Sequence, residues 1–214
     1  MNIYKKNLNQ LKQNFVYNET MEHDACGVGL VASTEGVKSR KVVEYGIQAL
    51  KAVWHRGAID ADGKTGDGAG IHIEIPKDFF IEKIEITGHR HDDSDLCVVM
   101  IFLPRNDYQG QEQFRIIVES ELTKKNFNIY GWRQVPVNPS VLGEKAENTR
   151  PEITQVLFKH NDKKVIGKNL ERVLYETRRK IEKEALNNQL NGFYICSFSS
   201  KSIIYKGMFL AEAL

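Results

Sequence analysis

EHDACGVGLVAS, residues 22–33, marks the point at which the chain changes character. Before it, residues 1–25 are polar, rich in Asn, Gln and Lys, and without periodicity. After it, apolar residues recur at the spacings of strands and helices. We therefore interpret residues 1–25 as a leader or propeptide and residues 26–214 as the beginning of a folded domain.

Apolar spacing downstream of this stretch predicts an α+β domain. Helices are expected over residues 39–53, 109–124 and 169–186, with a short one opening at Pro76. Strands are expected at residues 26–33, 71–75, 96–103, 127–137 and 151–158. A hairpin is expected over residues 192–206, turning around residues 199–201. Residues 54–70 contain five glycines and are expected to form a loop.

The composition excludes several classes of protein. Lys and Arg number 30 against 28 Asp and Glu, a formal net charge of +2, which is too balanced for a nucleic-acid binder. No apolar run approaches the roughly 18–20 residues of a membrane span, and the N-terminus lacks the features of a secretory signal. Three widely spaced cysteines argue against a disulfide framework or a structural zinc. A cytoplasmic location and no bound metal are expected.

Cys26 is the first candidate for chemistry. Gly27 and Gly29 let the backbone turn tightly beside its thiol. If the chain were cleaved after Ala25, Cys26 would also carry an α-amine with a pKa of about 7.7–8.0, close to the pKa of about 8.5 of its thiol. One residue would then supply both nucleophile and base. The alternative is a small buried residue at a strand edge.

Two further motifs follow the first expected helix. Arg56, in the run WHRGA (54–58), could pair with a carboxylate or simply face solvent. The run TGDGAG (65–70) superficially suggests a phosphate loop, but it lacks the Lys-Ser/Thr of a P-loop and precedes a strand instead of opening a helix. Close packing of its backbone against a neighbour is the preferred interpretation.

The remaining polar and thiol-bearing residues are given structural roles. The histidines and aspartates within residues 89–95 suggest a metal, but a solvated polar surface is preferred. Cys97 and Cys196 lie within apolar strand patterns and are expected to be inert. Residues 178–180, Arg-Arg-Lys, are interpreted as the solvated face of a helix.

Taken together, these motifs resemble those of a known family. EHDACGVGLVAS and GIQALKAVWHRGAIDADGKTGDGAGIHIEIP (46–76) are similar to the amino-terminal glutaminase domain of the glutamate synthase large subunit. The resemblance continues through GWRQVPVNPSVLGEKAENTRPEITQVLF (131–158) and FYICSFSSKSIIYKGMFLAEAL (193–214). The CGVG and HRG runs are typical of class II glutamine amidotransferases generally. TGDGAG and GWR-x-VPV are more specific to glutamate synthase.

This resemblance implies a fold, a reaction and a set of partners. The fold would be the four-layer αββα sandwich of N-terminal-nucleophile hydrolases. Removal of residues 1–25 would expose Cys26 as the nucleophile that hydrolyses glutamine, with Gly27 and Arg56 in supporting positions near the pocket. In whole enzymes of the family the ammonia meets 2-oxoglutarate in later domains, which carry FMN and an iron–sulfur cluster, and a small reductase subunit is a possible partner. No cofactor is expected in this segment, and the electron donor, nicotinamide or ferredoxin, stays open.

The family's later motifs do not occur in these 214 residues. The Asn-Gly oxyanion pair in a His-Asn-Gly-Glu context is absent, because His160-Asn161 is followed by Asp162. The later Arg and Asp that hold glutamine are absent too. Losing one oxyanion donor costs about 10²–10³ in rate. We therefore expect an incomplete domain that is inactive alone.

Two other hypotheses remain open from the sequence. The chain could be a non-catalytic fragment or binding module with the same fold, although the intact CGVG run disfavours this. It could also be an N-terminal-nucleophile hydrolase that acts on another amide, which the TGDGAG and GWR runs disfavour. Labelling by a glutamine-analogue alkylator distinguishes the three hypotheses.

Overall fold

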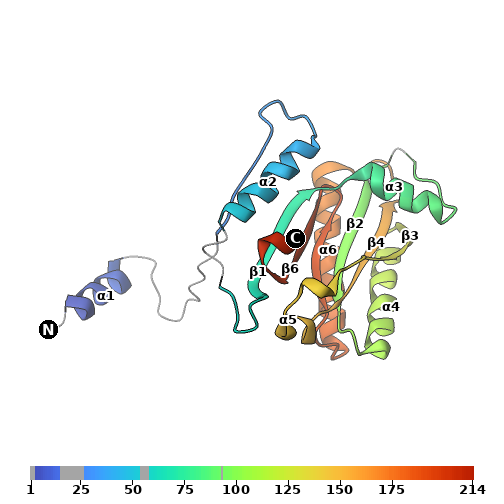
Figure 1. The fold of residues 1–214 in the computed structure, drawn as a ribbon. Coiled ribbons are helices and arrows are strands. Elements are labelled where there is room, and N and C mark those ends of the chain that lie inside the picture. Colours follow the sequence, from blue (N-terminus) through green and yellow to red (C-terminus); the bar gives the residue numbers. More distant parts are fainter. Residues whose placement is uncertain (1–2, 15–26, 54–57, 93) are drawn as a thin grey trace.

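The computed structural model describes residues 3–14, 27–53, 58–92 and 94–214 (Figure 1). Its helices are α1 (Ile3–Asn14), α2 (Arg40–Ala52), α3 (Lys77–Ile86), α4 (Tyr108–Lys124), α5 (Glu144–Asn148) and α6 (Gly167–Asn187), with short 3₁₀ turns η2 (Pro139–Val141) and η3 (Ala211–Ala213). Its strands are β1 (Thr65–Glu74), β2 (Leu96–Leu103), β3 (Phe127–Gln134), β4 (Glu152–His160), β5 (Tyr194–Ser199) and β6 (Ser202–Phe209). The expected α+β class is confirmed.

The strands of the described part form two sheets. One has four strands in the order β3-β4-β2-β5, and every neighbouring pair in it is antiparallel. The other has two strands, β1 and β6, also antiparallel. β2 is the strand predicted at residues 96–103, and its side chains are buried on both faces. Burial on both faces explains its continuous apolar run.

One hydrophobic core lies between the four-stranded sheet and two helices. Alternate side chains of β2, including Val99 and Ile101, pack in this core. The helices supply the facing residues at spacings of four or seven, which is the signature of an amphipathic helix. These residues are Phe114, Val118 and Leu122 of α4 and Leu170, Leu174 and Ile181 of α6. The helices predicted at 109–124 and 169–186 are thereby confirmed.

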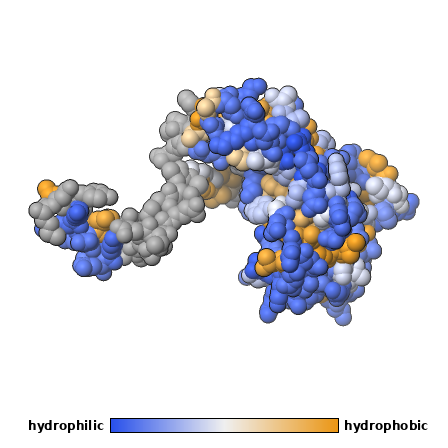
Figure 2. All heavy atoms as spheres, turned by 90° about the horizontal axis from the view of Figure 1, so that it is seen from below, coloured by the Kyte–Doolittle hydropathy of each residue, from blue (hydrophilic) through white to orange (hydrophobic). Residues whose placement is uncertain are grey.

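A second core lies between the two sheets. Val98 and Met100, the other side chains of β2, pack here with Ile203 of β6 and with Phe80 and Ile84 of α3. α2 contacts β1 and lies on the side of it away from α4 (Figure 1). The layers are therefore helices, sheet, sheet and helix, as expected for the αββα sandwich. Hydrophilic residues cover most of the surface seen in Figure 2, and hydrophobic residues show in patches.

The strand expected at residues 26–33 is a wrong prediction for its described part. Residues 27–33 form no regular structure, and Val28 and Leu30 are 94% and 91% exposed. A strand needs a neighbour to receive its backbone hydrogen bonds, and this segment has none among the described residues.

The loop expected through residue 70 is also corrected, because β1 begins at Thr65. The glycines of TGDGAG lie within this strand. A Cβ on Gly66 would lie 2.9 Å from the carbonyl atoms of Phe209, and one on Gly70 would lie 2.9 Å from the carbonyl oxygen of Tyr205. The glycines permit close approach to β6, so the expected packing against neighbouring backbone is confirmed although the loop is not.

The expected hairpin at residues 192–206 is the third correction. β5 and β6 follow each other with a two-residue turn, but β5 pairs with β2 and β6 pairs with β1. The chain therefore changes sheets at this turn. Glu171 of α6 holds the corner by accepting hydrogen bonds from the hydroxyls of Ser199 and Ser200 and from the Ser200 N–H.

Candidate active site

Of the three predicted site residues, only Gly27 lies within the described part of the chain. It is exposed and begins the irregular segment that leads towards α2. Cys26 and Arg56 lie outside the described residues. The structure therefore bears on this site through the residues around it, first of all those that follow Arg56 along the chain.

Residues 58–67 form a hairpin that leads into β1. Ala58 donates its N–H to Oδ2 of Asp67 at 2.8 Å, and its carbonyl accepts the Asp67 N–H at 3.2 Å. An isolated bridge joins Ile59 to Gly66, and the Asp60 N–H donates to the Thr65 carbonyl at 2.9 Å. We call this segment the 58–67 hairpin.

The carboxylate of Asp62 closes the tip of the 58–67 hairpin. It accepts the N–H groups of Lys64 and Thr65 at 2.9 and 2.7 Å and the Thr65 hydroxyl at 2.5 Å. The hydroxyl and N–H of Thr65 hold the pKa of Asp62 well below its ordinary value, because they stabilise the charged form. Asp-Gly and Thr are residues that favour such a side-chain-closed turn.

The hairpin tip is fixed to the segment that begins α5. Thr65, which is 3% exposed, accepts the Ala146 N–H through its hydroxyl oxygen at 3.3 Å. Lys145 pairs with Asp60 at 2.6 Å, and this hydrogen bond lowers the pKa of Asp60. Gly143 faces the hairpin so closely that a Cβ there would lie 2.1 Å from Oδ2 of Asp62. Sequence reasoning missed this contact, because the two segments are about eighty residues apart.

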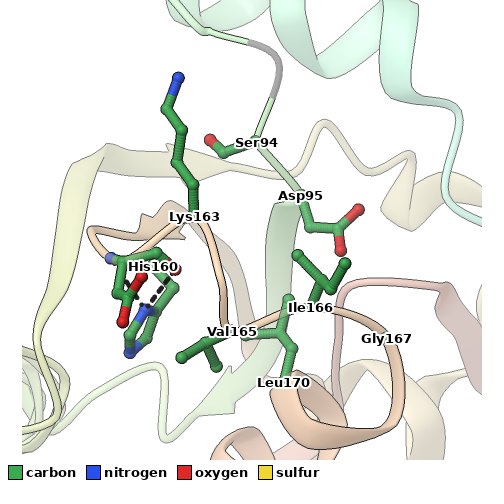
Figure 3. Close-up of a pocket in the computed structure, with 9 residues that line it drawn as sticks. Ser94, Asp95, His160, Lys163, Val165, Ile166, Gly167 and Leu170 are labelled. Carbon is green, nitrogen blue, oxygen red and sulfur yellow. Dashed lines mark hydrogen bonds between the residues drawn. The ribbon is translucent and has the colours of Figure 1, made fainter.

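A cavity of about 340 Å³ lies elsewhere, between the start of β2, the end of β4 and the start of α6 (Figure 3). Val165, Ile166 and Leu170 give it an apolar side, and the side chain of Lys163 extends away from them. Asp95 is paired with Lys77 at 3.5 Å. Among the described residues, neither Gly27 nor the 58–67 hairpin lines this cavity.

A metal was weighed against a solvated surface for the polar residues 89–95; His89 is exposed, whereas His91, Asp92, Ser94 and Asp95 are half-buried. His91 bonds the Tyr130 hydroxyl at 3.0 Å and the Ser94 carbonyl at 3.1 Å. Asp92 pairs with Lys159 and Lys163 at 2.9 and 3.1 Å. Burial lowers the pKa of His91 and raises the pKa of Tyr130 to about 12. The expected solvated surface holds for His89, the half-buried residues are more enclosed than expected, and Asp93 lies outside the described residues.

The two described cysteines lie in different hydrophobic cores. Cys97 is fully buried in the core under α4 and α6, and Cys196, 4% exposed, lies in the core between the sheets. Burial raises the pKa of both thiols, which disfavours the reactive thiolate. Their expected role as inert core residues is confirmed.

Arg178, expected on a solvated face, is instead a structural link. It donates to the Ile195 carbonyl at 2.9 Å and pairs with Glu182 at 2.8 Å, joining α6 to β5.

A chain of polar side chains that the sequence did not predict also joins the two sheets. Arg133 donates to Gln155 at 2.7 Å, and Gln155 donates to the Tyr205 hydroxyl at 3.4 Å.

Two features of the described residues bear on other functions. No group of three or more His, Cys, Asp or Glu side chains in this part of the chain is placed to hold a metal ion. None of the helices in the same residues has the length and apolar character needed to cross a membrane.

Comparison with known proteins gives a consistent result. Residues 26–214 match the family model of the class II glutamine amidotransferases. The glutamate synthase [NADPH] large chain of Azospirillum brasilense is 56% identical over 198 residues, which make up 92% of this chain and 13% of that protein. Two ferredoxin-dependent glutamate synthases are also similar. The second enzyme of Synechocystis is 38% identical over 188 residues, and the first of Arabidopsis thaliana is 39% identical over 195 residues.

The lengths of these relatives limit what the match covers. It takes in 87% and 90% of this chain for the Synechocystis and Arabidopsis proteins, but only 12% of each of them. This chain thus corresponds to about an eighth of the relatives it matches.

Proposed function

Because this chain belongs to the class II glutamine amidotransferase family, we propose that it supplies the nucleophile-bearing part of the glutaminase domain of a glutamate synthase. The observation that carries this proposal is the family match over residues 26–214, which begins at Cys26. The 56% identity to a glutamate synthase large chain points to that branch of the family. The two-sheet sandwich is the architecture that the resemblance implied.

Cys26 is the nucleophile in this proposal. Its sulfur attacks the side-chain carbonyl carbon of glutamine, and the carbon–nitrogen bond breaks as ammonia takes up a proton and leaves. Water then cleaves the glutamyl thioester to release glutamate and restore the thiol. The free α-amine of Cys26, exposed by removal of residues 1–25, accepts and returns the proton. Gly27 leaves room beside the thiol, and Arg56 orders the chain near it.

The other two thiols support this assignment by exclusion. Cys97 and Cys196 are buried in separate cores, and burial raises the pKa of each. Neither can present a thiolate to a polar substrate without unfolding of the sandwich around it. Cys26 is the remaining cysteine of the sequence.

The ammonia is used, in this proposal, with 2-oxoglutarate to make a second glutamate elsewhere in a longer protein. FMN and an iron–sulfur cluster would serve that step. The described residues do not fit an iron–sulfur cluster, because their two cysteines lie in different cores and no other ligand cluster accompanies them. We place both cofactors outside this segment. The higher identity to a relative named for NADPH favours a nicotinamide donor and a reductase subunit as partner.

A hybrid enzyme tests the proposal. In the Azospirillum large chain, the matched segment is replaced by residues 1–214 of this protein, and ammonia release from glutamine is measured. We expect glutamine hydrolysis that disappears in Cys26→Ser but persists in Cys196→Ser. The intact mass of the product should be that of a chain beginning at Cys26.

Two results would contradict the proposal. One is a folded hybrid that hydrolyses no glutamine, and the other is activity that survives Cys26→Ser. In the folded hybrid, a diazoketone analogue of glutamine should alkylate Cys26 faster than it alkylates free cysteine, and equal rates would count against a glutamine site.

A further inference from the structure

Asn191 and Gly192 lie in the connection between α6 and β5, outside both elements. Both residues are exposed, and Gly192 has a φ of 80°, in the left-handed region that favours glycine. Within the described residues, the N–H of Gly192 donates to no protein acceptor. The Asn191 side chain makes a local hydrogen bond from Nδ2 to the Gln189 carbonyl at 3.2 Å. An asparagine amide and the backbone nitrogen that follows it are therefore both open to solvent.

This pair of groups can react within the chain itself. The backbone nitrogen of Gly192 attacks the side-chain carbonyl carbon of Asn191, and glycine has no Cβ to hinder the approach. A carbon–nitrogen bond forms and closes a succinimide ring, while the bond from that carbon to Nδ2 breaks. Ammonia leaves with the proton that the Gly192 nitrogen gives up. Water then opens the ring at either carbonyl and produces aspartate or isoaspartate.

Asn188 is the natural comparison, because it is exposed in the same connection. The backbone nitrogen that follows it belongs to Gln189, whose N–H donates to the Leu186 carbonyl at 3.0 Å. That nitrogen is engaged, and it carries a side chain beside it. Asn191 is the only asparagine of the sequence that a glycine follows. The chemistry and the local structure therefore single out the same residue.

We propose that Asn191-Gly192 is a site of spontaneous deamidation in the folded protein, passing through a succinimide and ending in aspartate and isoaspartate. Water is the co-reactant, and the attacking and leaving groups both belong to the chain. The inference stands independently of the proposed function, because it uses no residue of the candidate active site.

The position of the site gives the modification a structural effect. Leu190 and Phe193, on either side of it, are partly buried against the core under α4 and α6. The Leu190 N–H donates to the Ala185 carbonyl at 2.9 Å, and the Phe193 ring stacks on Phe114 with their centroids 4.8 Å apart. Isoaspartate routes the main chain through the former side chain and adds a methylene between these two anchors. Because a close-packed core resists such a shift, molecules that contain isoaspartate should be less stable.

Mass spectrometry of aged protein tests the site. The 214-residue chain is incubated at neutral pH, and its cooperative unfolding transition shows that it is folded. We expect Asn191 to lose its amide several-fold faster than Asn188, with both aspartate and isoaspartate as products. A parallel sample in urea gives the rate for the unfolded chain, and the rate at Asn191 in folded protein should approach it. Fragmentation by electron transfer distinguishes the two products.

Three variants separate the chemistry from its effect on stability. Asn191→Gln keeps an amide, but its longer side chain disfavours ring closure, so its mass and melting temperature should not change on ageing. Fresh Asn191→Asp carries the charge without the longer backbone, and it should melt as the fresh parent does because the residue is exposed. Asn188→Gln, the matched control, should age as the parent does. Aged parent should melt a few degrees lower as its isoaspartate content rises.

An Asn191 amide that survives in folded protein, under conditions that convert it in urea, would overturn the inference, because the fold would then protect the site. Loss of the amide no faster than at Asn188 would overturn it as well. Isoaspartate-containing protein that melts as fresh protein would refute the structural effect assigned to the flanking anchors. If the 214-residue chain shows no cooperative transition, the same peptide from the folded hybrid large chain decides by the same comparison.

Discussion

Glu171 accepts two hydrogen bonds from Ser200, one from the backbone N–H and one from the hydroxyl, both at 2.8 Å. Ser200 lies in the turn between β5 and β6, where the chain passes from one sheet to the other. A side chain of α6 therefore accepts the backbone N–H of Ser200, which lies outside both strands. This single carboxylate closes the corner of the sandwich.

Removing this carboxylate should destabilise the fold. Ser200 is 3% exposed, so Glu171→Ala leaves a buried N–H without an acceptor, which costs about 1–3 kcal/mol. Urea unfolding of the 214-residue chain would measure the loss. Glu176→Ala, which removes exposed ion pairs with Arg172 and Lys125, should cost less than about 1 kcal/mol. Equal losses in the two variants would contradict the role given to Glu171.

The glycines of β1 should resist substitution. Gly70→Ala places a methyl group 2.8 Å from Cβ of Lys206 and 2.9 Å from the Tyr205 carbonyl, which should cost about 1–3 kcal/mol. Gly46→Ala in α2 meets only ordinary contact and should stabilise the chain by up to about 1 kcal/mol, because alanine favours helix. Opposite signs in thermal unfolding are expected. A neutral Gly70→Ala would show that β1 and β6 are not so close.

His91 should make stability depend on pH. Its pKa is lowered in the folded state, chiefly by burial, so the unfolded chain binds protons more readily. The stability it contributes is present above the unfolded pKa of about 6.5 and is lost as pH falls below it. Melting temperature should therefore fall between about pH 7.5 and 5.5, and fall less in His91→Gln. An identical pH dependence in both proteins would contradict this assignment.

The carboxylates should act at lower pH. Arg150 and Arg105 lower the pKa of Glu147 to about 2, so the stability from this group is present above its unfolded pKa. That stability is lost as pH falls from about 4.5 towards 2. Glu147→Gln should reduce the steepness of acid unfolding only in this lower range. A change confined to the range above pH 5 would not fit this pair.

Thiol labelling should separate the three cysteines. Cys97 and Cys196 should react with iodoacetamide only in denaturant, because both are buried. Cys26 should account for the labelling of the native protein, and Cys26→Ser should abolish it. Peptide mass spectrometry identifies the modified residue, and rapid native labelling of Cys97 would contradict the buried assignment.

The parts of the fold that could be predicted from sequence are those whose pattern is set by local burial. β2 was predicted residue for residue, because a strand covered on both faces carries an uninterrupted apolar run. α4 and α6 were predicted to within two residues at each end, because each packs one stripe on the sheet. Asp107, which accepts the Gly110 N–H, caps the start of α4.

The errors arose where a distant segment decides the structure. The first half of β1 contains glycines, which suggest a loop in sequence, but each of the two discussed faces the backbone of β6. The turn after β5 suggests a hairpin in the sequence. In the structure β5 and β6 belong to different sheets, and Glu171 of α6 binds the turn between them. Residues 27–33 have the alternation of a strand, but no described strand lies beside them.

The candidate site divides in the same way. Short motifs identify Cys26, Gly27 and Arg56 as the residues of interest, and these assignments remain predictions. The link from Thr65 to Ala146 could not be predicted, because the two residues are about eighty positions apart in the sequence. In the sequence, Asp67 belongs to a run that superficially suggests a phosphate loop. In the structure, its carboxylate accepts the Ala58 N–H and closes the base of the 58–67 hairpin.

The pairing of β1 with β6 has a consequence for the order of assembly during synthesis. β2, β3 and β4 are neighbours in the sheet and emerge from the ribosome in sequence, so their pairing needs only the chain already made. β1 emerges before all of them, but its partner β6 follows them in the sequence. Long-range pairing of this kind forms slowly. The pairing that anchors the 58–67 hairpin therefore waits until β6 has emerged, when β2, β3 and β4 can already have paired.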